Sequence, residues 1–273
     1  VAIGASIAGD RAFCAMKHVG LNVAADPLYT VSYTGVNGGL VIAVADDPGM
    51  HSSQNEQDSR HHAIASKVPM LEPSDSAECK DFAMKAYEMS EYFDTPVIVR
   101  LSTRVSHSQS IIDVFERREV PTKEYVKNPQ KYVTLPAHSR ALHTKVEERT
   151  GKLVEYAETS SLNRTEINPD TKIGVITSGI SYQYAKEALG DTVSYLKLFC
   201  HTSTYSTSPN SFKCTSISLS NSARLASSSL ISAIIKRKAV EIYFRSIFIS
   251  CKRRKQNRIS VIFLFFVFRF VDF

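Results

Sequence analysis

Residues 40–49 read LVIAVADDPG and indicate the fold class more directly than any other stretch of this 273-residue chain. The first six are apolar without alternation, which is typical of strands covered on both faces, as in parallel sheets. The next four, Asp46-Asp47-Pro48-Gly49, are residues that turns prefer. A buried strand that ends in such a turn predicts a parallel sheet with helices on both sides.

The segments before this strand show the same alternation of helix and strand. Residues 1–11 (VAIGASIAGDR) are typical of the later turns of a helix rich in small residues, and residues 12–16 predict a short buried strand. Asn22 is expected to cap a helix that continues to about Tyr33. A strand and a helix therefore precede the central strand.

The segments after the central strand continue the pattern. Residues 69–71 predict a minimal strand, and Asp75 and Glu78 have the spacing of a capping box in front of an amphipathic helix. Residues 96–101 (PVIVRL) predict another buried strand. Together these elements predict an α/β fold with a doubly wound parallel sheet, in a first domain of residues 1–115.

A polar segment follows each predicted strand. These segments are residues 17–22, 46–60, 72–74 and 102–108. Open parallel sheets bind ligands outside the carboxyl ends of their strands, so we expect these loops to meet on one edge and to form a site. The alternative is that they are polar because buried loops would leave backbone groups without partners.

A second domain is expected to begin at residue 172. Residues 116–171 predict an extended connector with one hairpin at residues 145–158, and residues 172–198 (a strand, Ser178-Gly179 and a helix over 181–189) predict the start of a second α/β domain. The Ser-Gly turn could hold a phosphate at the helix N-terminus, or it could be an ordinary strand–helix connection.

The composition changes abruptly near residue 198. Residues 1–198 have 21 basic and 25 acidic residues, whereas residues 199–273 have 12 basic and two acidic residues and no glycine. We expect this Ser-rich basic tail to be disordered and not native, as translated non-coding or frame-shifted DNA would be. The alternative is a basic arm that binds nucleic acid.

Cysteine spacing and hydropathy restrict the class of protein. The five cysteines include no Cys-x-x-Cys pair, which argues against a zinc or iron–sulfur site within this chain. The longest apolar run, residues 261–268, has eight residues, and a membrane helix needs about 20. No signal peptide is visible, so we expect a cytoplasmic protein with no membrane partner.

Four segments resemble a known family. They are MKHVGLNVAADP (16–27), VADDPGMHSSQNEQDSRHHA (44–63), VRLSTRVSHS (99–108) and GVITSGISYQYAKEAL (174–189). They are similar to the alpha subunits of indolepyruvate ferredoxin oxidoreductases, within the thiamine-diphosphate-dependent 2-oxoacid:ferredoxin oxidoreductases. The resemblance runs from residue 1 to about residue 198. It implies an enzyme that oxidatively decarboxylates arylpyruvates with CoA and ferredoxin to aryl-acetyl-CoA, CO2 and reduced ferredoxin.

The sequence is also compatible with two other functions. One is a pyruvate- or 2-oxoglutarate-type member of the same superfamily. The other is a non-catalytic interaction module whose basic tail binds nucleic acid, which we consider the weaker alternative. Salt-dependent binding that disappears with residues 199–273 would distinguish the latter.

The resemblance also implies cofactors and partners. The complete enzyme would contain thiamine diphosphate with Mg²⁺ and an iron–sulfur cluster, and would work with a beta subunit and ferredoxin. Residues 1–115 would be its pyrimidine-binding domain, and the part from residue 172 would be transketolase C-terminal-like. The activating Glu is expected upstream of Val1, and the chain has no Gly-Asp-Gly…Asn loop. We therefore expect the pyrophosphate, Mg²⁺ and cluster sites to lie outside this chain and the chain to be inactive alone.

The resemblance assigns roles to nine residues. Arg60 would bind the substrate carboxylate, a role that suits a bidentate guanidinium. The other substrate-binding candidates are His51, Ser52, Ser53 and Asn55, and the cofactor-binding candidates are His18, Asn22, Arg104 and His107. The alternatives are that Arg60 and Asn22 only cap helices and that the residues of the 51–55 segment only order their loop. His18 could instead be a structural histidine with its hydrogen bonds satisfied, and Arg104 and His107 could face the partner domain. No residue is assigned to a metal.

Overall fold

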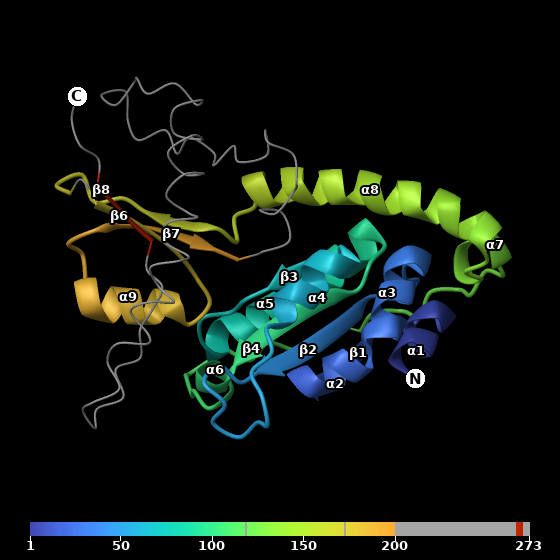
Figure 1. Cartoon of the computed structure of the whole chain (residues 1–273), viewed down its shortest axis with the longest axis horizontal. Coiled ribbons are helices and arrows are strands. Elements are labelled where there is room, and N and C mark those ends of the chain that lie inside the picture. The colour runs from blue at the N-terminus through green and yellow to red at the C-terminus, as the bar shows by residue number, and fades with distance from the viewer. Residues whose placement is uncertain (118, 172, 200–265, 270–273) are drawn as a thin grey trace. The chain divides into compact units, whose positions relative to one another are not determined.

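The structure is a computed structural model that describes residues 1–117, 119–171, 173–199 and 266–269 (Figure 1). Its elements are α1 (Ala2–Ala8), β1 (Ala12–Lys17), α2 (His18–Val23), α3 (Ala25–Thr34), β2 (Leu40–Asp46), α4 (Ser59–Ser66), β3 (Met70–Leu71), α5 (Ser76–Phe93), β4 (Val97–Ser102), α6 (Thr103–Ser106), α7 (Pro129–Tyr132), α8 (Pro136–Thr159), β5 (Arg164–Glu166), β6 (Ile173–Ser178), α9 (Ser181–Leu189), β7 (Ser194–Leu198) and β8 (Phe266–Arg269). Most of the predicted tail therefore lies outside the described residues.

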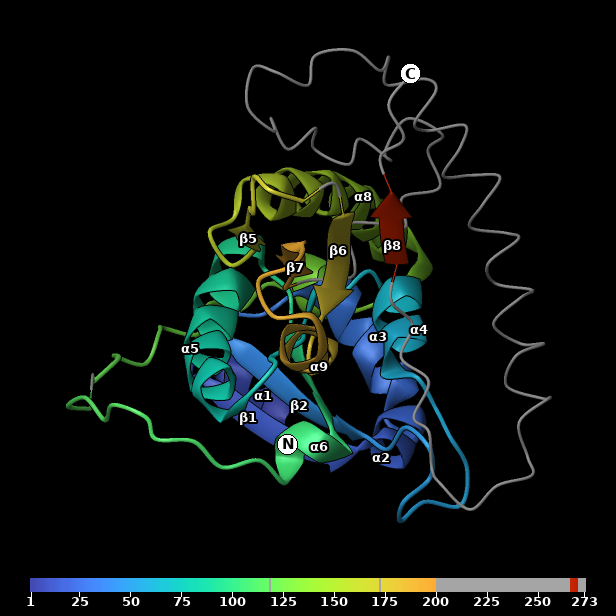
Figure 2. The same cartoon turned by 90° about the vertical axis from the view of Figure 1, so that its left-hand side faces the viewer.

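The first sheet confirms the predicted parallel α/β fold. Its strands lie in the order β1-β2-β4-β3, and each neighbouring pair in this sheet is parallel. Successive side chains of a strand point to opposite faces. Leu40 and Ile42 thus pack in a core with α1 to α4, whereas Val41 packs in a second core with α5 and α8. Helices cover both faces of this sheet (Figures 1 and 2).

The predicted helix cap at Asn22 is wrong. A helix already begins at His18, because β1 runs directly into α2. This helix ends at Val23, and Ala24 separates it from α3. Asp26 and Pro27 lie in the first turn of α3, where an acidic residue and a proline are both tolerated. Asn22 is therefore an interior residue of α2 and not a cap.

The predicted hairpin at residues 145–158 is also wrong. This segment belongs to α8, the long helix across the top of Figure 1. The buried residues of α8 include Leu142, Val146 and Leu153, which recur at helical spacing. Gly151 is exposed, so it costs the helix only about 1 kcal/mol relative to alanine. The apolar stripe outweighs the turn preference of this single glycine.

Arg149 anchors α8 on the first sheet's helices. Its side chain is buried, and its guanidinium donates to the Asp94 carbonyl oxygen at 3.1 Å and to the Ser32 carbonyl oxygen at 2.8 Å. Asp94 caps the C-terminus of α5, and Ser32 lies in the last turn of α3. Burial lowers the pKa of Arg149 to about 10, although the charge of Asp94 acts in the opposite direction. The carbonyl dipoles at the two helix ends stabilise the buried cation.

The second sheet is mixed. β6 pairs in parallel with β7, and β5 pairs antiparallel to β7, in the order β5-β7-β6-β8. The strand and the helix predicted after residue 172 are present as β6 and α9. The strand β5 within the predicted connector was not expected. It pairs with β7 through Thr165 and Leu196.

Candidate functional site

The polar loops that follow β1, β2 and β4 contact one another, as expected. The Lys17 Nζ atom donates to the Ser52 carbonyl oxygen at 2.8 Å and lies 3.8 Å from Asp47 Oδ2. The Thr103 hydroxyl donates to Asp47 Oδ1 at 2.8 Å. Because Lys17, Asp47 and Thr103 come from the ends of three different strands, the loops meet at the carboxyl edge of the sheet.

A largely buried group of five charged side chains lies at the same edge. We call it the ionic cluster; it consists of Asp46, Asp58, Arg60, Glu72 and Arg100. Arg100, on β4, donates from Nε to Asp46 Oδ2 at 2.5 Å and from Nη1 to Glu72 Oε1 at 2.8 Å. Asp46 also accepts from the backbone N–H and hydroxyl of Ser59, the first residue of α4. The cluster thus joins β2, β4, the end of β3 and the start of α4.

Arg60 is held within this cluster by two carboxylates. Its Nε and Nη2 atoms donate to Glu72 Oε1 at 2.7 Å and Oε2 at 3.2 Å, and Nη1 donates to Asp58 Oδ2 at 3.1 Å. Burial lowers the pKa of Arg60, but the opposite effects of Glu72 and then Asp58 are larger, so the pKa lies above its usual value. The side chain remains 31% exposed, so a ligand can reach it.

Asp47 orders the loop between β2 and α4. Its carboxylate accepts from the backbone N–H groups of His51 at 3.1 Å and Ser52 at 2.8 Å, and from the Ser53 hydroxyl at 2.5 Å. The Ser52 hydroxyl accepts from Lys17 Nζ at 3.2 Å. Ser52 and Ser53 therefore have the loop-ordering contacts that were the alternative to ligand binding.

Substituting Asp47 with asparagine is expected to destabilise the protein in a pH-dependent way. The hydrogen bond from Ser53, followed by that from Ser52, lowers the pKa of Asp47 below its usual value. A lowered pKa contributes stability that is present above the unfolded-state pKa of about 3.9 and is lost as the pH falls through the folded-state value. The difference from wild type should be constant above about pH 5 and shrink below about pH 4. Urea denaturation at several pH values measures this difference in the free energy of unfolding. A difference that stays constant into the acid range would contradict the lowered pKa of Asp47.

The other predicted site residues divide into exposed and buried ones. The exposed ones are Asn22, His51, Asn55, Arg104 and His107. Asn22 donates to Gln57 Oε1 at 3.3 Å, which places it beside the loop that leads into α4 and Arg60. His18 is fully buried, and neither ring nitrogen has a hydrogen-bond partner among the described residues.

Sequence reasoning missed most of the ionic cluster. Asp46, Asp58, Glu72 and Arg100 were not assigned a role. One signal was present: Arg100 interrupts the apolar run PVIVRL, and a charged residue within a buried strand needs a charged or polar partner. The identity of its partners required the strand order.

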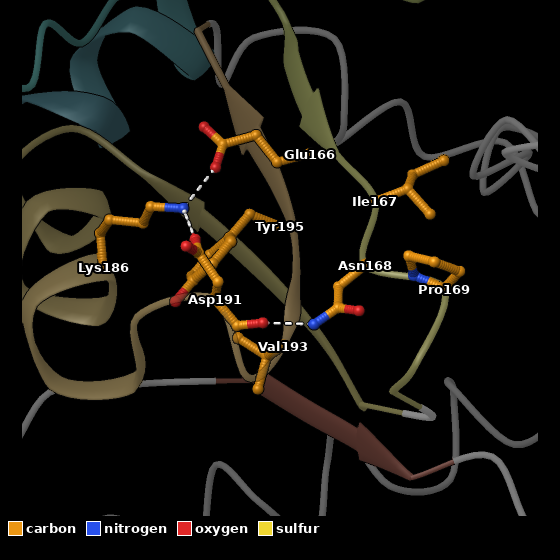
Figure 3. Close-up of a pocket in the computed structure, with 8 residues that line it drawn as sticks. All are labelled: Glu166, Ile167, Asn168, Pro169, Lys186, Asp191, Val193 and Tyr195. Carbon is orange, nitrogen blue, oxygen red and sulfur yellow. Dashed lines mark hydrogen bonds and ion pairs between the residues drawn. The ribbon is translucent and has the colours of Figure 1, made fainter.

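A separate cavity lies beside the second sheet (Figure 3). Its volume is about 320 Å³, and Lys186 on its wall forms ion pairs with Glu166 at 2.8 Å and Asp191 at 2.7 Å. Asn168 and Asp191 precede β6 and β7, so this cavity lies at the amino ends of those strands. Its charges are paired within the fold, and ligands of such sheets bind at the opposite end. We therefore assign the candidate functional site to the carboxyl edge of the first sheet, where the ionic cluster lies.

The described residues contain neither a metal-binding group nor a membrane-spanning helix. In residues 1–117, 119–171, 173–199 and 266–269, no group of three or more His, Cys, Asp or Glu side chains is arranged to hold a metal ion. Within the same ranges, no helix has the length and apolarity needed to cross a membrane.

Comparison with known proteins gives the family. Residues 1–171 match the model described as pyruvate flavodoxin/ferredoxin oxidoreductase, thiamine diphosphate-binding. This chain belongs to that family. The match covers the first sheet with α1 to α8, and therefore includes the ionic cluster.

Similar proteins of this oxidoreductase family include subunit IorA of indolepyruvate oxidoreductase. The chain is 45% identical to IorA of Archaeoglobus fulgidus over 191 residues, which covers 69% of the chain and 30% of the relative. It is 47% identical to IorA of Pyrococcus horikoshii over 207 residues, covering 72% of the chain and 32% of the relative. The chain thus spans about a third of the length of these relatives. The predicted resemblance to indolepyruvate ferredoxin oxidoreductase alpha subunits is confirmed.

A solved structure of the same class supports the fold. The 2-oxoglutarate:ferredoxin oxidoreductase from Magnetococcus marinus, with 2-oxoglutarate, coenzyme A and succinyl-CoA bound, matches with a TM-score of 0.53 and 16% identity. The match covers 72% of this chain and 43% of that chain. At this identity the likeness shows the fold and says nothing about the substrate.

Proposed function

We propose that this chain carries the substrate-carboxylate site of an oxidoreductase that oxidatively decarboxylates arylpyruvates such as indolepyruvate. CoA and ferredoxin would be the co-substrates, and a beta subunit would complete the cytoplasmic enzyme. The observation that carries the proposal is the partly exposed Arg60 guanidinium, fixed by two carboxylates at the carboxyl edge of the sheet. The identity with relatives named for indolepyruvate supports the aryl substrate class over pyruvate or 2-oxoglutarate.

Arg60 has donors left for a substrate. Its three hydrogen bonds to Glu72 and Asp58 use one N–H each on Nε, Nη1 and Nη2. A guanidinium has five N–H groups, so one on Nη1 and one on Nη2 remain beyond these bonds. Two such donors match the two oxygens of a 2-oxoacid carboxylate. Arg60 would thereby orient the keto group relative to the cofactor.

The described residues fit only one part of thiamine diphosphate. Polar side chains of the carboxyl edge, including Asn22, Arg104 and His107, are exposed and could contact its aminopyrimidine ring. The buried His18 ring carries two nitrogens that have no hydrogen-bond partner within the part of the chain that the structure describes. We place the diphosphate, Mg²⁺ and the iron–sulfur cluster on other parts of the enzyme. When bound, the cofactor supplies the nucleophilic carbon that attacks the keto group.

Substituting Arg60 with alanine tests the proposal. In the subunit at the length of its relatives, the KM for arylpyruvate should rise by about 10- to 100-fold with a smaller change in kcat, because a charge-assisted contact to the substrate is lost. Arg140, exposed on α8, gives the matched control Arg140→Ala, which should leave KM unchanged. An unchanged KM in Arg60→Ala would eliminate the carboxylate role. Turnover of pyruvate or 2-oxoglutarate in preference to arylpyruvates would instead favour the other substrate classes.

A further inference from the structure

We infer that Glu72 positions the Arg60 guanidinium for the substrate carboxylate, and that contacts with the second sheet fix the place of Glu72. This inference rests on the proposed function of Arg60. It makes Glu72 a positioning residue, since its carboxylate touches Arg60 and Arg100 and acts on the substrate only through Arg60.

The geometry at Glu72 restricts Arg60 to one orientation. The Glu72 side chain is 2% exposed, and its two oxygens accept from Nε and Nη2 of Arg60 as a parallel pair. Such a bidentate contact sets the plane of the guanidinium. The Arg100 guanidinium also donates to Oε1, at 2.8 Å, and is a second cation that holds this carboxylate. Rotation of Arg60 away from Glu72 would break both charge-assisted hydrogen bonds of this pair at a buried carboxylate, which disfavours other orientations.

The backbone of Glu72 is held by the end of the second sheet. Glu72 directly follows β3, and its backbone N–H donates to the Phe199 carbonyl oxygen at 3.0 Å, just after β7. Two residues further, the Ser74 hydroxyl accepts from Lys197 Nζ at 2.9 Å. Both Ser74 and Lys197 are buried, and Lys197 is also paired with Glu78 at the start of α5. The segment that carries Glu72 is thus fixed independently of Arg60.

The first test measures Arg60 itself and needs no substrate. In the full chain, the Arg60 Nε–H should give a slowly exchanging NMR signal, assigned by its loss in Arg60→Lys. Glu72→Gln should speed its exchange by about tenfold or more, because the amide cannot replace the bidentate acceptor. Glu88, exposed and paired with Lys85 on α5, gives the control Glu88→Gln, which should change nothing. Thermal melting identifies variants that fail to fold, and Glu72→Asp, one methylene shorter, serves as the second variant. Unchanged exchange at Arg60 in both Glu72 variants would overturn the inference.

The second test uses the assembled enzyme and separates the inference from the proposed function. Glu72→Gln should raise the KM for arylpyruvate by about tenfold, but should add little in an Arg60→Ala background, because it acts through Arg60. If Arg60→Ala leaves KM unchanged, the proposed function fails. If Arg60→Ala raises KM and Glu72→Gln does not, the proposed function stands and the positioning role of Glu72 fails. Independent, additive losses would indicate a structural role only and would also overturn the inference.

Discussion

Substituting Arg100 with methionine is expected to lower the free energy of unfolding by about 3–5 kcal/mol. Arg100 is 9% exposed and donates to Asp46 and Glu72, whose side chains are both nearly inaccessible. Methionine fills a similar volume but leaves two buried carboxylates with fewer partners. Removing one member of a buried ion pair is costly because the desolvated charge that remains is not compensated.

Urea denaturation of the two proteins at neutral pH measures this effect. Arg104→Met is the matched control, since Arg104 lies four residues away and is exposed; its change should stay within about 0.5 kcal/mol. A loss for Arg100→Met as small as that of the control would show that the cluster contributes little to folding. The remaining role of the ionic cluster would then be to hold the charges around Arg60 in place.

Substituting Phe93 with alanine should cost about 3–5 kcal/mol of unfolding free energy. Phe93 is buried at the end of α5 and meets Tyr156 of α8 edge to face, with ring centroids 5.3 Å apart. Tyr156 in turn meets Phe199 at 6.3 Å. The substitution creates a cavity and removes one of the ring contacts that join α5 to α8, and such pairs add to the area that they bury.

The neighbouring aromatic residue is the control for Phe93. Tyr92 is 80% exposed, so Tyr92→Ala should cost less than about 1 kcal/mol although it removes a ring of similar size. Equal losses for the two variants would mean that the contact between α5 and α8 is not a packed interface. The comparison can be made by chemical denaturation at a single pH.

Much of the first sheet could be predicted, because its signals are local. The apolar runs at residues 40–45 and 96–101 correspond to β2 and β4, and Asp75 caps α5 as expected by accepting from the Glu78 backbone N–H. The errors arose where local and tertiary preferences compete. Gly151 suggested a turn, yet the stripe of Leu142, Val146 and Leu153 decides for a helix because these residues are buried, and Leu153 packs in the core with α5.

The sequence predicts at which edge of the sheet the candidate site lies, but not which of its side chains contact one another. Loops at the carboxyl ends of parallel strands must share an edge, so the meeting of Lys17, Asp47 and Thr103 follows from the fold class. The pairing of Arg60 with Glu72 does not follow, because it depends on β3 lying beside β4 rather than beside β2. The residue spacing carries no information on that order. The assigned roles of His51, Asn55 and Arg104 in binding ligands remain predictions.

The anchor of α8 has an evolutionary consequence. Besides a contact with the Ser32 hydroxyl at 3.2 Å, Arg149 binds Ser32 and Asp94 through main-chain carbonyl oxygens, which every amino acid possesses. Either position can therefore change its side chain without losing that hydrogen bond. Correlated substitutions between α8 and the helix ends should be weak even though the contact is strong, so methods that infer contacts from covariation should underestimate this interface. In an alignment of homologues, this interface should be recognisable because Arg149 is retained while the residues around it vary.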